Sequence, residues 1–125
     1  MIFGQTNQQK RNKIVKNAEN AVFTTKSGIR QMTKKKSTYG SNALANGTKK
    51  SITVLQNHIN SPLFRNSPVN RKMLMKYRNR QVKSMMDVEK TKMVVLQKNN
   101  INRLKKQQQN RNIKNLNRRL AKLKA

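Results

Sequence analysis

Apolar positions in the C-terminal part of the chain recur with the spacing of an α-helix. After Pro68 no Gly or Pro interrupts the sequence, and Lys, Arg, Gln, Leu and Met are strong helix formers. Ser67 can cap the free N–H groups, and Pro68 suits the first helical position. We therefore predict a long basic helical arm over 68–125, continuous or broken, which would be about 85 Å long at about 1.5 Å per residue.

Three apolar patches follow the three- and four-residue steps of helix faces along this predicted arm. Ile113 follows Ile101 by 12 residues rather than 14, so the last patch is out of register with the middle one. We therefore expect no continuous coiled-coil seam. The last patch is a candidate anchor for a protein partner. The patches are Val82, Met86, Met93 and Leu96; Val94, Ile101 and Leu104; and Ile113, Leu116, Leu120 and Leu123.

The N-terminal part of the chain has a weaker pattern. Residues 1–9 carry no periodic signal and are expected to form an extended tail. Over 10–24 the spacing of Ile14, Ala18 and Val22 predicts a short amphipathic helix. Its start is basic, which opposes the helix dipole and would be relieved by an anionic partner.

Residues 25–67 are rich in Gly, Ser, Thr and Asn, which favours an irregular basic segment. Such a segment suits threading through grooves of a larger body, and a linker without fixed structure is the alternative. Within it, 51–60 is predicted to be a short helix. The alternation of Ile52 and Val54 also fits a strand.

The tripeptide Asn-Ser-Pro occurs twice, at 60–62 and at 66–68. Each Pro disfavours helix at the preceding Ser, so this region is predicted to be a kinked connector. Between the two copies, Leu63 and Phe64 are candidate anchors for an apolar pocket of a partner. The two Ser-Pro pairs also fit phosphorylation sites.

The charge of the chain argues against a self-sufficient fold. Thirty Lys and Arg face only three acidic residues, which gives a net charge of +27 that repels itself and attracts polyanions. Ile, Leu, Val and Phe together number 27 of 125 residues, close to the composition of chains that are disordered alone. We therefore expect a mainly α, non-globular protein with long irregular extensions, in which one long C-terminal helix and one or two short helices are ordered on a partner.

The basic residues expected to contact a polyanion gather in three stretches. A charge run is usually a solvated face, but these charges cover more than one face and lack acidic counterparts. Lys76, Arg80 and Lys83 share one helix face, whereas the last stretch, with Lys114 and Lys122, surrounds the helix. The stretches are Lys34, Lys35, Lys36, Lys49 and Lys50; Arg71, Lys72, Lys76, Arg78, Arg80 and Lys83; and Arg103, Lys105, Lys106, Arg111, Arg118 and Arg119.

The sequence lacks the residue patterns of enzymes and metalloproteins. His58 is the only histidine, there is no cysteine, and Asp87 and Glu89 point to different sides of a helix. The glycines form no phosphate-binding loop, and no apolar run reaches the roughly 18 residues of a membrane span. We expect no catalysis, metal site, cofactor, small-molecule substrate or membrane span.

Zinc-finger, RNP-type and KH-type motifs are also missing, so the basic residues are expected to bind phosphates rather than to read bases. A basic helix with basic, loop-like extensions is similar in composition to many small ribosomal proteins, without a shared motif. The first prediction is therefore an intracellular, RNA-binding structural component of a large ribonucleoprotein. A ribosomal protein, cytosolic or mitochondrial, that threads between rRNA helices beside other proteins fits best.

Two other hosts would suit the same charge. An acidic protein polymer such as a microtubule fits the segmented helix and the Leu63–Phe64 anchor, although a filament binder needs less charge than +27. A DNA-condensing protein of a virion or of chromatin would package a genome without sequence preference. RNase treatment separates the RNA host from the protein host, because only the first would release the chain.

Overall fold

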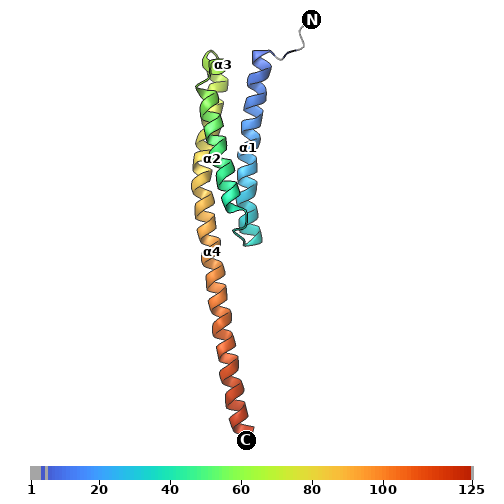
Figure 1. Ribbon diagram of the computed structural model, residues 1–125, viewed down its shortest axis with the longest axis vertical. Coiled ribbons are helices and arrows are strands. Elements are labelled where there is room, and N and C mark those ends of the chain that lie inside the picture. The colour runs from blue at the N-terminus through green and yellow to red at the C-terminus, as the bar shows by residue number, and fades with distance from the viewer. Residues whose placement is uncertain (1–3, 5, 125) are drawn as a thin grey trace.

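The computed structural model describes residue 4 and residues 6–124, and this part of the chain forms four helices and no β-strand (Figure 1). The mainly α fold and the long C-terminal helix are thereby confirmed. Helices α1 and α2 are antiparallel to each other, and both pack along the first half of α4, whose second half continues alone. The helices are α1 (Asn7–Lys35), α2 (Ser41–Ile59), α3 (Pro62–Arg65) and α4 (Pro68–Lys124).

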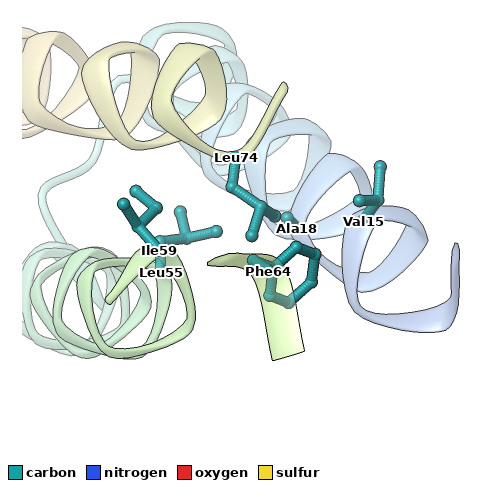
Figure 2. Packing of buried hydrophobic residues seen from close by; sticks show 6 residues of the cluster. All are labelled: Val15, Ala18, Leu55, Ile59, Phe64 and Leu74. Atoms are coloured by element: carbon teal, nitrogen blue, oxygen red, sulfur yellow. The ribbon is translucent and has the colours of Figure 1, made fainter. Parts of the chain in front are cut away.

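The apolar core lies where α3 turns the chain from α2 into α4 (Figure 2). Phe64 and Leu74 are fully buried there, and Leu63 is partly buried against the same cluster. Phe64 is therefore not free to enter a partner's pocket, whereas the anchor role of the partly buried Leu63 stays a prediction. Pro62 starts the short helix α3, which directs Phe64 into the chain's own core. The remaining members of the cluster are Val15, Ala18, Leu55 and Ile59.

Helix α1 begins earlier than the sequence pattern suggested. Thr6 and Gln9 form a capping box, in which the Thr6 hydroxyl accepts from the Gln9 N–H at 3.1 Å and the Gln9 side chain accepts from the Thr6 N–H at 2.9 Å. Of the tail expected over 1–9, the segment 7–9 is thus helical, and residues 1–3 and 5 lie outside the described part of the chain.

The irregular segment predicted for 25–67 is largely helical, which corrects that expectation, and the strand alternative for 51–60 is wrong as well. The loop-forming threonines satisfy their hydroxyls within the helices by donating to the carbonyl four residues earlier, as Thr48 does to Leu44 at 2.8 Å. Gly28 allows a close approach of α2, because a Cβ there would lie 2.7 Å from a methyl carbon of Leu44. Only the turns remain non-helical.

Four buried residues of α4 recur every seven residues. We call the row of positions that continues this spacing along α4 the core lane. Gln81 in this lane joins the three long helices, donating to the Thr25 hydroxyl of α1 at 3.2 Å and to the Ser51 hydroxyl of α2 at 3.1 Å. The first two apolar patches predicted for α4 are instead exposed to solvent. The buried members of the core lane are Leu74, Gln81, Val88 and Val95.

Candidate polyanion-binding surface

The predicted basic residues lie almost entirely at the surface. Sixteen of the seventeen are exposed, and Arg78 is half-buried. Three groups result: the end of α1 with two lysines of α2, the exposed side of α4 within the bundle, and the part of α4 beyond the bundle. The structure therefore does not gather them into one patch: twelve are distributed along α4, and the other five lie at the end of α1 and on α2.

Two of the predicted arginines hold the bundle together. Arg78 donates to the Gln56 side chain of α2 at 2.7 Å, and Arg71 donates through Nε to the Ile59 carbonyl near the end of α2 at 3.2 Å. Both retain further donors, but their positions are fixed by these contacts. Arg11, absent from the predicted set, similarly joins α1 to α3 by donating to the Leu63 carbonyl at 3.1 Å.

On the exposed side of α4, the predicted shared face of Lys76, Arg80 and Lys83 is present. These side chains line a shallow depression together with Lys72 and Asn79. Steps of three and four residues along one helix put their charges on one side of α4. This face can bind neighbouring phosphates of one polyanion without any contribution from α1 or α2.

Lys34, Lys35 and Lys36 lie where α1 ends, beside the point at which α4 leaves the bundle. Lys36 adopts a left-handed backbone conformation with φ 52°, and its carbonyl accepts from the Asn99 side chain at 3.1 Å. The end of α1 thus places three positive charges beside the part of α4 that leaves the bundle. The predicted residues Lys49 and Lys50 are exposed on α2.

Beyond Leu96, every described residue of α4 is exposed, and we call 97–124 the distal segment. It carries ten basic side chains and no acidic one. All three acids of the chain lie elsewhere, Glu19 on α1 and Asp87 and Glu89 on the first half of α4. The basic residues of the distal segment are Lys98, Arg103, Lys105, Lys106, Arg111, Lys114, Arg118, Arg119, Lys122 and Lys124.

At the end of the distal segment, the last apolar patch and four of the basic side chains lie on opposite sides of the helix. At about 100° per residue, the mean direction of one basic row lies roughly 180° from that of the last apolar patch. We call these the basic ladder and the terminal stripe. The basic ladder is Arg111, Lys114, Arg118 and Lys122, and the terminal stripe is Ile113, Leu116, Leu120 and Leu123.

The described part of the chain contains no group of three or more His, Cys, Asp or Glu side chains suited to hold a metal ion. His58 is half-buried, with its ring edge-on to Phe64 at a centroid distance of 6.3 Å. None of the four helices described above is long and apolar enough to cross a membrane. Comparisons with protein families, with curated proteins and with solved structures each find no match for this chain.

Proposed function

We propose that the protein is a non-catalytic, RNA-binding structural component of a large ribonucleoprotein. The observation that carries this proposal is the distal segment, which presents ten basic side chains and no acid on a helix that nothing in the bundle covers. The three acids of the chain can pair with at most a small part of its 30 basic residues. The remaining positive charge favours binding to phosphates of another molecule.

The geometry of a single bare helix suits RNA. A helix with its side chains is about 10–12 Å across, and duplex RNA is bound through its shape, phosphates and 2′-hydroxyls rather than by base reading in its narrow major groove. We infer that the distal segment inserts between RNA helices and neutralises their phosphates. A ribosome, cytosolic or mitochondrial, is the host that the composition favours.

The salt dependence of RNA binding tests this proposal. We expect the full chain to bind an RNA duplex with a log–log salt slope of about −7 to −9, for on the order of ten phosphate contacts. Replacing the basic ladder with glutamine should reduce the magnitude of that slope by about 3 to 4. A matched variant, Lys10, Lys13, Lys16 and Lys26 to Gln, removes four exposed charges from α1 and should reduce it by less than about 1.

Three results would contradict the proposal. Equal losses in the two quadruple variants would mean that binding follows net charge and not the distal segment. Equal affinity for duplex DNA and RNA under competition would favour a DNA-condensing protein. Retention of the chain on its native particle after complete RNase digestion would favour an acidic protein polymer as the host.

A further inference from the structure

The core lane of α4 does not stop where the bundle ends. Continued at the same spacing of seven residues, it is polar at two positions and then apolar again, so that two residues of the terminal stripe resume the row that faces α1 and α2. The prediction that the last patch is out of register compared it with Ile101, which is exposed and outside this lane. The later members of the core lane are Asn102, Gln109, Leu116 and Leu123.

A second row of the bundle interface continues in the same way. It lies four residues after each core-lane position, and its members within the bundle are half-buried, for example Met85 and Lys92. At the same spacing this row reaches Ile113 and Leu120. A straight helix turns such rows by about 20° per heptad, so Leu116, three heptads after Val95, is rotated about 60° from it.

The terminal stripe therefore has the pattern of a helix–helix interface without its partner. Its side chains are exposed to 55%, 56%, 53% and 82% in chain order. Burial of apolar surface of this kind against a second apolar surface favours association. The basic ladder lies on the opposite side, so a molecule bound to the stripe leaves the ladder accessible.

We propose that the terminal stripe is a docking site for an amphipathic helix of another protein, one with an apolar seam and acidic edges. The site goes beyond the proposed RNA binding and does not rest on it. The apolar seam would pack on the four stripe residues as α1 and α2 pack on the earlier part of the core lane. Acidic edges would pair with Arg119 and Lys124, which flank the stripe on either side.

Neither the chain's own helices nor a second copy suits this surface as well. The α1–α2 turn lies beside Asn99, and the stripe starts 14 residues later, about 21 Å further along at about 1.5 Å per residue. A second copy would bring another ten basic residues and no acid to the same interface, and like charges across an interface oppose association.

The test uses the full chain and a synthetic three-heptad peptide with Leu at its seam positions and Glu at its edges. We expect this peptide to bind, and a control peptide with Ser in place of Leu to bind at least about tenfold more weakly. The double variant Leu116→Asn, Leu120→Asn should also lose about tenfold or more, and its RNA affinity should stay within about twofold.

A matched variant controls for the loss of exposed apolar surface in general. Ile101→Asn with Leu104→Asn changes two residues of similar exposure, 46% and 57%, on other faces of the distal segment. Its affinity for the Leu peptide should change by less than about twofold, because these residues lie outside the stripe. Equal binding of the Leu and Ser peptides, or equal losses in the two double variants, would overturn the proposal.

The native particle provides a second test. A photoreactive side chain at Leu120 should cross-link to an acidic, amphipathic helical segment of another protein, identified by mass spectrometry of the joined peptides. A cross-link from this position to RNA would overturn the proposal. So would sedimentation of the wild-type chain as a dimer that the Leu116→Asn, Leu120→Asn variant abolishes, because a second copy would then be the occupant.

Discussion

The two halves of α4 show how one helix can be both a core element and a free surface. In the bundle, Leu74, Val88 and Val95 of the core lane are buried against α1 and α2. In the distal segment, Leu116 and Leu123 of the same lane are exposed. The backbone is helical throughout, so the difference comes from what covers the helix and not from the helix itself.

Charge separates the two halves as well. The first half of α4 contains Asp87 and Glu89, and Glu19 of neighbouring α1 adds a third acid to the bundle. The distal segment contains none. In a helix without acidic residues the basic side chains repel one another along its length, and a bound polyanion relieves this repulsion. The half that lacks a cover is thus also the half with the most unbalanced charge.

The largest difference in the free energy of unfolding is expected when the same substitution is made in each half of α4. Leu74→Ala should lower the free energy of unfolding by about 2–5 kcal/mol, since it leaves a cavity in the core. Leu116→Ala, in the same lane, should lower it by less than about 0.5 kcal/mol, because the side chain is exposed. Urea unfolding measures both values. Similar losses would mean that the distal segment is packed in solution.

The second prediction concerns the turn between α1 and α2, beyond which neither helix packs on α4. Gly40 has φ 80°, a left-handed conformation, so Gly40→Ala should destabilise the bundle by about 1–2 kcal/mol. Gly47 is the control, since it lies within α2 and an added Cβ would meet no atom within 4 Å. Gly47→Ala should stabilise by about 0.5–1 kcal/mol, seen as a higher midpoint of thermal unfolding. Destabilisation at Gly47 would contradict the open space beside it.

A smaller effect is expected at the polar position of the core lane. Gln81 is fully buried and its Oε1 has no hydrogen-bond partner, so Gln81→Leu replaces two hydrogen bonds and one unsatisfied atom with apolar surface. We expect the free energy of unfolding to rise by zero to about 1 kcal/mol. Gln109→Leu, in the same lane of the distal segment, should leave it unchanged. A loss above about 2 kcal/mol at Gln81 would show that the polar layer stabilises the bundle.

The smallest effect on the free energy of unfolding is expected from removing most of the distal segment. Truncation after Asn100 retains the hydrogen bond from Asn99 to the turn, and the described residues that it removes, 101–124, are all exposed. The free energy of unfolding of the bundle should therefore change by less than about 0.5 kcal/mol. RNA affinity should fall strongly, because nine basic residues are lost. A bundle that unfolds on truncation would contradict the division of α4 into two independent halves.

Local signals were enough to predict some of the fold. Helix α4 begins at Pro68, where the sequence places its start, and strong helix formers continue to the end of the described chain. The start of α1 was readable as well, because Thr6 and Gln9 have the spacing of a capping box, but that signal was overlooked. A helix end that is set by local capping residues and helix propensity can be predicted from the neighbouring sequence.

Other features depend on residues that are distant in the sequence. The helices predicted over 10–24 and 51–60 overlap α1 and α2, but the end of α1 and the start of α2 were missed because their Thr, Ser and Gly residues resemble a loop. The two helices pack closely there, as at Gly28 and Leu44. The core lane was missed because a glutamine interrupts it and more conspicuous apolar patches lie on exposed faces. The exposure of most basic residues followed from their charge, whereas the structural contacts of Arg71 and Arg78 did not.

By itself, the sequence determined that this protein is mainly helical and carries far more positive charge than it can pair internally. Propensity, capping and net charge are properties of neighbouring residues or of the whole composition, so they need no knowledge of the fold. Only the tertiary structure decided which face of α4 is covered, where the cover ends, and that Phe64 belongs to the chain's own core. Burial is a relation between distant segments, because water leaves an apolar side chain only when another segment takes its place.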